Sequence, residues 1–323
     1  MIKKVISIIS MIILCSTLFI GCKSFSVQGK ALITVITKTT ETDFWRAVKG
    51  GCNAAANEYN VDMIFQGPDN EEDFEAQNKM IEDAIENGTQ AIVLSAIDQD
   101  KSIEVIEKAA ARGIYIVIID SGINSGIPEV IISTDNYAAG EKAGEAMLNV
   151  AYTELKIGMV NFAQGTANGQ EREEGFTDVI EKAKGAQIVG KVSVDSNLES
   201  AKKGTFELIK EHPEINAIIA FNEFTTLGAG SAVDDLGLSN SIKVIGFDNN
   251  NTAIGLLEDG VIEGLMVQNQ FAIGYLGVES AYNLIAERYI EEREIYMEVT
   301  LVDSTNLFEE NIQKIVFPLE NNN

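Results

Sequence analysis

The sequence predicts an α/β fold of two doubly wound parallel-sheet lobes joined by a three-strand hinge. Apolar runs that end in polar residues alternate with helical patterns through short connections, which is typical of parallel sheets. The length of 323 residues is too great for one simple core and suits two lobes. The same order of strand ends also occurs once in each half of the chain, in Thr89–Asp100 and Gly113–Gly122, and again in Ile215–Thr226 and Ser241–Asn250.

The first 22 residues are expected to be a secretory signal and not part of the fold. A basic start precedes a nearly uncharged apolar run, Val5 to Ile20, which is short for a membrane span. The run ends at Gly21-Cys22 and resembles a bacterial lipobox, in which the cysteine becomes the acylated first residue. We therefore expect an extracytoplasmic body that is anchored to the cell membrane, by lipid on Cys22 or by an uncleaved N-terminal segment.

The composition disfavours several classes of partner and activity. The 49 acidic and 24 basic residues give a formal net charge of −25, so nucleic acid and anionic lipid would repel the chain, and a neutral small ligand or a protein partner fits better. The only histidine, His212, makes a Ser/His triad or an H-E-x-x-H zinc site hard to build. The acidic cluster Asp69–Asp73 lacks the ligand spacing of an EF-hand and is expected to be a solvated helix start. We expect no enzyme, no cofactor and no bound metal.

The first lobe is expected from residues 30–134 together with 269–299. Asp43 is a candidate cap for the helix that follows it, and Asn87-Gly88 is a candidate end for the next helix. The expected elements, in order, are strand 31–37, a helix from 44, strand 61–66, helix 71–87, strand 90–94, helix 101–111 and strand 114–119.

The second lobe is expected from residues 135–268 together with 300–323. The chain should pass between the lobes near residues 134, 268 and 300, and several parallel connections favour a hinge. A helix over 272–288 should return to the first lobe, and strand 299–302 should cross once more. The other expected elements are helix 136–150, strand 156–161, helix 170–184, strand 186–192, helix 198–211, strand 216–220, helix 224–236, strand 242–247, a short helix that ends at 255–259, and strand 261–267.

Ligands of parallel α/β sheets bind beyond the carboxyl ends of the strands. Two such edges that face each other across a hinge would form a cleft that holds carboxylates, amides and two aromatic rings but very few cations. This set suits a neutral polyol, because carboxylates accept from hydroxyls, amides donate and accept, and aromatic rings cover the apolar faces of a ring. The residues at these edges are Thr37–Trp45, Ser95–Asp98, Asp120–Ser121, Asn222–Glu223, Asp248–Asn249 and Gln268.

Each candidate also has a purely structural interpretation. Asp120 and Asp248 could cap the next helix or form a turn. The adjacent aromatic residues Phe44 and Trp45 could belong to the core. Arg172 could reach the cleft, or it could pair with the two glutamates that follow it on a solvated helix.

Several stretches together resemble the type I periplasmic sugar-binding proteins, in the branch similar to ribose-binding protein among the receptors of ABC transporters. These stretches are TETDFWRAVKGG, IVIIDSG, STDNYAAGEKAG, QEREEGF, AFNEFTTLGA and VIGFDNN, and the resemblance covers essentially the whole mature chain. It implies that Phe44 and Trp45 stack on a sugar. It also implies that hydroxyls of the sugar are bound by Asp120, Asn222, Asp248 and Gln268.

The resemblance has departures that bear on the ligand. Ser121 and Gln170 stand where the ribose receptor carries arginines, which changes the hydrogen-bond pattern and puts ribose itself in doubt. A pentose such as xylose, or a similar small aldose or polyol, is therefore expected. Further candidates for the site are Thr42, Ser121, Asn168, Gln170 and Arg172.

The resemblance also implies a partner at the membrane. The closed form would be presented to an ABC permease or, as in some members of the family, to a membrane histidine kinase or chemoreceptor. A hydrolase on the same scaffold is a third interpretation, disfavoured because the chain lacks evident pairs of nucleophile and base.

Overall fold

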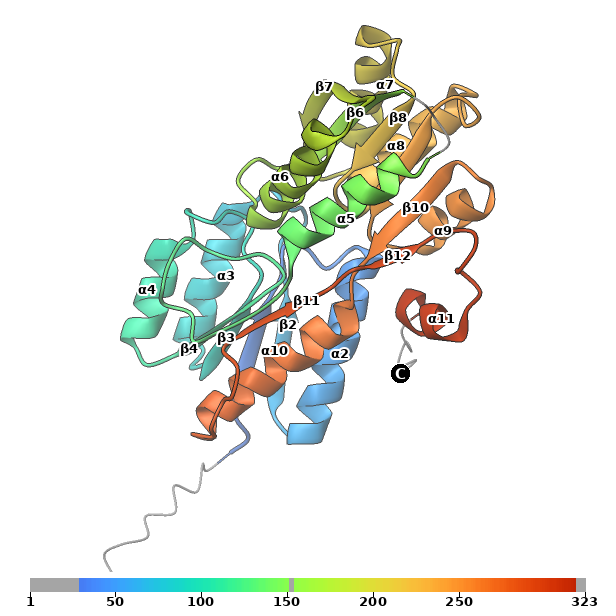
Figure 1. The fold of residues 1–323 in the computed structure, drawn as a ribbon. Helices are drawn as coiled ribbons and strands as arrows, with labels where there is room; N and C mark the ends of the chain where they lie inside the picture. The colour runs from blue at the N-terminus through green and yellow to red at the C-terminus, as the bar shows by residue number, and fades with distance from the viewer. Residues whose placement is uncertain (1–28, 151–153, 318–323) are drawn as a thin grey trace, which may run out of the picture. The chain divides into compact units, whose positions relative to one another are not determined.

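The strands form two six-stranded sheets (Figure 1). The computed structural model describes residues 29–150 and 154–317, so the predicted signal segment and Cys22 lie outside the described residues. The described residues from Ala31 onward form one compact unit.

In spatial order the first sheet consists of β11 (Glu294–Met297), β5 (Val130–Thr134), β4 (Tyr115–Ile119), β3 (Ala91–Leu94), β1 (Leu32–Ile36) and β2 (Asp62–Gln66). The second consists of β12 (Thr300–Val302), β10 (Ile262–Val267), β9 (Lys243–Phe247), β8 (Ala217–Ala220), β6 (Leu155–Phe162) and β7 (Ala186–Val194).

Helices cover both faces of each sheet, and each sheet with its helices is called a lobe below. The helices of the first lobe are α2 (Asp43–Tyr59), α3 (Phe74–Glu86), α4 (Ile103–Ala111) and α10 (Gln270–Ile285). Those of the second lobe are α5 (Asn136–Leu148), α6 (Ala167–Lys182), α7 (Leu198–Glu211), α8 (Glu223–Asp235), α9 (Asn251–Glu258) and α11 (Glu310–Val316). The central strands β3 and β8 are buried along their whole length because apolar side chains pack on both of their faces.

The predicted α/β class with two mostly parallel sheets is confirmed. The pairs in the first sheet are all parallel, as is each pair in the second except β10 with β12, which runs antiparallel. Parallel neighbours place the carboxyl ends of their strands at one edge, so each sheet presents one row of loops where a ligand can bind.

The chain passes between the lobes at three places within the described residues. It leaves the first sheet after β5 to form α5, returns after β10 to form α10, and leaves again between β11 and β12. Each lobe is therefore assembled from segments that are far apart in the sequence.

Several element boundaries differ from those expected. The helix expected over 71–87 begins only at Phe74, because the side chain of Asp73 caps it. The cap of α2 is Thr42, whose hydroxyl accepts from the N–H of Trp45, and Asp43 is the first helical residue. Strand β11 was not predicted, since its residues are alternately exposed and half-buried at the edge of a sheet and give no apolar run.

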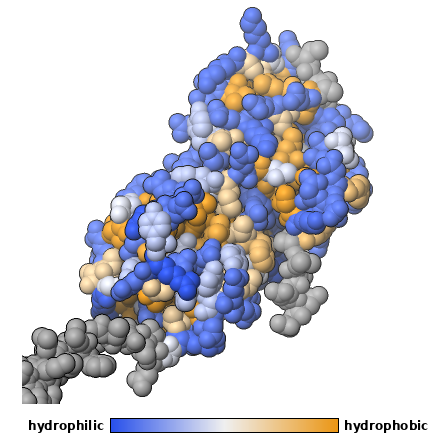
Figure 2. Space-filling view, turned by 60° about the horizontal axis from the view of Figure 1, so that its bottom comes forward, coloured by the Kyte–Doolittle hydropathy of each residue, from blue (hydrophilic) through white to orange (hydrophobic). Residues whose placement is uncertain are grey.

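Hydrophilic side chains cover most of the face drawn in Figure 2, and hydrophobic ones gather in scattered patches. Large apolar side chains that are exposed include Tyr289, Phe308 and Tyr296. Within residues 29–150 and 154–317, no helix combines the length and the apolar character that a membrane crossing requires.

Candidate functional site

A small cavity of about 30 Å³ lies where the carboxyl-end loops of the two sheets meet. Residues from both lobes line it, and most of them directly follow a strand or begin a helix. The lining residues are Lys38, Thr42, Phe44, Trp45, Glu71, Asp120, Phe162, Asn168, Arg172, Asn222, Glu223, Phe224, Asp248 and Gln268.

The structure brings most of the predicted site residues together at this cavity. Those that line it are Phe44, Trp45, Asp120, Asn222, Asp248, Gln268, Thr42, Asn168 and Arg172. Two candidates are not among the lining residues. Ser121 is buried, and Gln170 is exposed and donates to the backbone carbonyl of Gln164, in a separate groove on the second lobe.

Asp120 and Asp248 occupy equivalent positions in the two lobes. Each directly follows a buried strand, and each has a positive φ, 57° and 66° respectively, which lies in the left-handed region that Asp tolerates better than most residues. The alternative that Asp248 caps the next helix is wrong, because the side chain of Asn250 caps α9. The turn interpretation holds, and the turn brings each carboxylate to the cavity wall.

Both aspartates accept several hydrogen bonds. The carboxylate of Asp120 accepts from the Ser95 hydroxyl at 2.8 Å and from the Asn168 amide at 3.2 Å. The carboxylate of Asp248 accepts from the Gln268 amide at 2.6 Å and from the backbone N–H of Glu223 at 3.0 Å. These bonds fix the orientation of two acceptor groups before any ligand is considered.

Arg172 lies inside the cavity wall and is only 1% exposed, so the alternative of a solvated pair with neighbouring glutamates is wrong. Its Nε donates to Asn136 Oδ1 at 2.9 Å and its Nη1 donates to the Phe221 carbonyl at 2.8 Å. The guanidinium carbon lies 4.6 Å from the ring centroid of Phe247, a cation–π contact. Its Nη2 has no hydrogen-bond partner among the residues that the structure describes.

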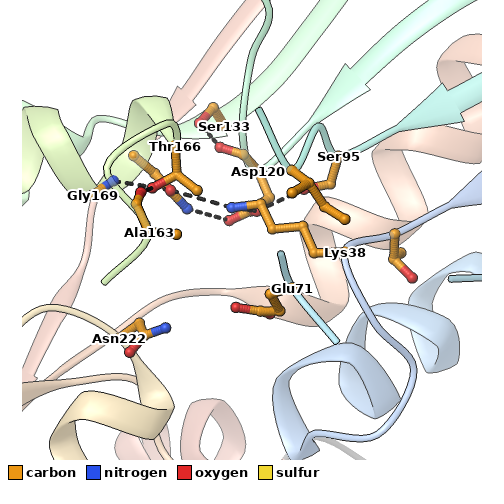
Figure 3. Close-up of polar contacts among 12 residues, drawn as sticks. Lys38, Glu71, Ser95, Asp120, Ser133, Ala163, Thr166, Gly169 and Asn222 are labelled. Atoms are coloured by element: carbon orange, nitrogen blue, oxygen red, sulfur yellow. Dashed lines mark hydrogen bonds and ion pairs between the residues drawn. The ribbon is translucent and has the colours of Figure 1, made fainter. Parts of the chain in front are cut away.

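Lys38 also lines the cavity. It lies in the stretch Thr37–Trp45 that was expected at this edge, but it was not selected as a site residue because a lysine is rarely buried. Its ammonium lies 3.5 Å from the Asp120 carboxylate and donates to Asn168 Oδ1 at 3.3 Å (Figure 3). Of the cavity's two cations, Arg172 was among the predicted candidates and Lys38 was not.

Two glutamates were also missed. Glu71 was expected on a solvated helix start, yet it is 8% exposed and lines the cavity. Glu223 follows Asn222, as expected for this edge, but was not selected as a site residue. Burial raises the pKa of Glu223 to about 7 and that of Asp248 to about 6. The negative charge of Asp248 also contributes to the raised pKa of Glu223.

Phe44 and Trp45 form an aromatic wall, with ring centroids 4.8 Å apart in an edge-to-face arrangement. The indole Nε1 of Trp45 donates to Glu71 at 3.0 Å. Both residues also belong to the core of the first lobe, so the core interpretation is correct, and both line the cavity as well.

The cavity thus carries four carboxylates, two cations, three side-chain amides and several aromatic rings. It offers fixed acceptors for hydroxyl hydrogens and flat apolar surfaces, and its wall contains a buried guanidinium N–H without a partner. No group of three or more His, Cys, Asp or Glu side chains with the arrangement of a metal site occurs in the described part of the chain.

Comparisons with known proteins relate this fold and cavity to characterised relatives. A family model described as a periplasmic binding protein domain matches residues 33–288. The D-ribose/D-allose-binding protein of Pseudomonas aeruginosa is 26% identical over 294 residues, which cover 85% of this chain and 91% of that protein. An ABC transporter solute-binding protein from Agrobacterium vitis, solved with bound D-fucose, is 30% identical with a TM-score of 0.85, and the match covers 88% and 100% of the two chains. A chain of the XylFII–LytSN complex is 25% identical with a TM-score of 0.79, covering 86% of this chain and 99% of that one.

Proposed function

Because the chain belongs to the periplasmic binding protein family, whose members bind solutes and are not enzymes, we propose that it captures a monosaccharide for an ABC sugar transporter outside the cytoplasm. A pentose such as xylose, or a ribose-like sugar, is the favoured ligand. Relatives of similar identity include a D-ribose/D-allose-binding protein and a protein solved with D-fucose, so small aldoses are the class to test.

The observation that carries this proposal is the arginine in the cavity wall. A buried guanidinium N–H without a partner is costly, and an oxygen of the ligand would satisfy Nη2 of Arg172. Sugar hydroxyls can both accept from this arginine and donate to the carboxylates of Asp120 and Asp248. The aromatic wall of Phe44 and Trp45 suits the apolar face of the same ring.

The charges in the cavity favour a neutral ligand. Four carboxylates outnumber the two cations, so a sugar acid or a sugar phosphate would be repelled while a polyol with many hydroxyl donors would be attracted.

A thermal-shift screen of the purified protein tests the proposal. The panel contains xylose, ribose, arabinose, glucose, xylitol, xylonate and several amino acids, because any ligand that binds the folded state raises the melting temperature by mass action. We expect a clear shift with a neutral pentose and none with xylonate. A response confined to amino acids or to xylonate would refute a neutral sugar as the ligand.

A second candidate function is sensing, in which the sugar-bound form associates with a membrane histidine kinase or chemoreceptor. The similarity to a chain of the XylFII–LytSN complex favours this candidate. A pull-down with the extracytoplasmic domain of a histidine kinase encoded beside this chain, with and without the sugar, distinguishes the two. Sugar-dependent association would support sensing, and stimulation of an ABC permease alone would support transport.

We propose in addition that lipid on Cys22 anchors the protein to the membrane. The support is the signal-like segment that ends at this cysteine. Release of Cys22→Ser protein into the soluble fraction, together with loss of palmitate labelling, would be the expected result.

A further inference from the structure

Two buried glutamates, one in each lobe, accept hydrogen bonds from residues of the opposite lobe. Glu71, in the loop before α3 of the first lobe, accepts from the hydroxyl of Ser196 in the second lobe at 2.6 Å. Glu223, the first residue of α8 in the second lobe, accepts from the backbone N–H of Phe44 in the first lobe at 3.3 Å. Both glutamates also line the cavity.

Each glutamate holds one of the two residues of the aromatic wall. The second oxygen of Glu71 accepts from the indole N–H of Trp45, which fixes the plane of that ring. Phe44 is the second residue of α2, where a backbone N–H has no partner within its own helix, so Glu223 caps this helix from the opposite lobe. A carboxylate at a helix N-terminus is also favoured by the helix dipole.

Further hydrogen bonds tie both crossings to the second lobe. The hydroxyl of Ser196 accepts from the Asn222 amide at 2.8 Å, and the backbone N–H of Ser196 donates to Glu72. The second oxygen of Glu223 accepts from the Asn250 amide at 2.8 Å. The chain of contacts therefore runs from the aromatic wall through each glutamate to loops at the carboxyl ends of β7, β8 and β9.

We propose that Glu71 and Glu223 are positioning residues that orient Phe44 and Trp45 as the two lobes meet, so that lobe closure and alignment of the aromatic wall are one event. The inference deepens the proposed function and rests on it only for the measurement made with sugar. The contacts themselves are made between protein atoms, so they can be tested without any ligand.

The two glutamates should respond differently to the same conservative change. In Glu71→Gln the amide oxygen can accept from Trp45 while the amide NH₂ donates to the Ser196 hydroxyl, so the crossing is kept. In Glu223→Gln one carboxylate oxygen is replaced by an NH₂ group, which cannot accept a hydrogen bond. Either the Phe44 N–H or the Asn250 amide therefore loses its acceptor. Asn250 cannot turn its amide around without losing the bond that its oxygen accepts from the backbone N–H of Ala253.

The first experiment measures acrylamide quenching of Trp45 fluorescence in the full chain without sugar. Trp45 is the only tryptophan and is 2% exposed, so its accessibility reports how far the lobes stay together. We expect the quenching constant to rise about twofold in Glu223→Gln and in Ser196→Ala, as the population of the closed form falls, and to stay at the wild-type value in Glu71→Gln. Matched controls are Asp69→Asn and Asp234→Asn, which remove exposed acids from the same loop as Glu71 and the same helix as Glu223.

The second experiment measures dissociation of the sugar found in the thermal-shift screen by stopped flow. We expect about tenfold faster dissociation in Glu223→Gln, with little change in association rate, and wild-type dissociation in the controls Asp69→Asn and Asp234→Asn. Wild-type quenching in both Glu223→Gln and Ser196→Ala would overturn the inference, as would equal effects of the two Gln changes. A wild-type protein that binds no sugar would instead overturn the proposed function, and the quenching result would still decide the role of the glutamates.

Discussion

At the scale of single residues, a backbone angle decides where the acceptor groups of the site lie. Asp120 and Asp248 both sit at positive φ directly after a buried strand, and the turn sends each carboxylate into the cavity wall. Their positions were predictable because an apolar strand that ends in Asp is visible in the sequence. Lys38 and Glu71 were not predictable, because their burial depends on partners as distant as Asn168 and Ser196, 130 and 125 residues away.

Asp120→Ala and Asp248→Ala should each weaken sugar binding about ten- to hundredfold, or about 1.5–3 kcal/mol, as for hydrogen bonds to charged groups. Isothermal titration calorimetry on folded protein measures this, with Asp234→Asn as a control for loss of a negative charge. Unchanged affinity in both Ala variants would remove these two residues from the site.

Stability should depend on pH through Glu223. Its pKa rises from 4.5 to about 7 on burial, so the folded state holds a proton that the unfolded state has released between these values. The contribution of Glu223 to stability is therefore fully present below pH 4.5 and is lost as the pH rises through 7. The free energy of unfolding of the wild type minus that of Glu223→Gln should fall from pH 5 to 7, by at most about 1.4 kcal/mol per pH unit. Urea denaturation at several pH values measures this difference, and a constant difference would contradict the assignment.

At the scale of elements, close helix contacts place the site arginine. A Cβ added at Gly140 of α5 would lie 2.1 Å from the Arg172 carbonyl oxygen, and one added at Gly175 of α6 would lie 2.1 Å from the Tyr137 carbonyl oxygen. The two helices can approach this closely only because both positions are glycine. Most helices and strands were predictable from apolar periodicity, whereas this approach was not, since a glycine in a helix pattern does not say what packs against it.

Gly175→Ala should destabilise the second lobe by about 1–3 kcal/mol through overpacking and should also weaken sugar binding, because α6 must shift and carry Arg172 with it. Thermal unfolding and calorimetry measure the two effects. The control is Gly255→Ala on α9, where an added Cβ meets nothing within 4 Å and stability should be kept or slightly raised. Equal stability and equal sugar affinity of the two variants would show that α5 and α6 can accommodate an added methyl group at their contact.

At the scale of the whole molecule, the acidic composition sets how the chain responds to salt. A formal net charge of −25 makes the folded state repel itself, and this repulsion is screened over about 10 Å at 0.1 M salt. The two-lobe plan was predictable because the order of strand ends is repeated. The contacts that join the lobes were not, because they pair residues such as Phe44 and Glu223 that lie 179 positions apart.

The melting temperature at pH 8 should rise as sodium chloride is increased from 10 mM to 300 mM, because screening relieves the repulsion between carboxylates. The same salt series near pH 4, where many carboxylates are protonated, serves as the control and should show a smaller rise. A melting temperature that falls with salt at pH 8 would mean that ion pairs outweigh the repulsion.

Because the chain passes between the lobes three times, the order of its elements determines when each lobe can be completed during synthesis from the N-terminus. All strands of the second sheet except β12 lie between residues 155 and 267 and are available in one uninterrupted stretch. The first sheet must wait, because α10 and β11 are supplied only after residue 269, and until then the face of α2 around Gly51 stays uncovered. The first lobe is therefore completed by β11 only after nearly all of the second sheet has been made, and the second lobe is completed after that by β12 and α11.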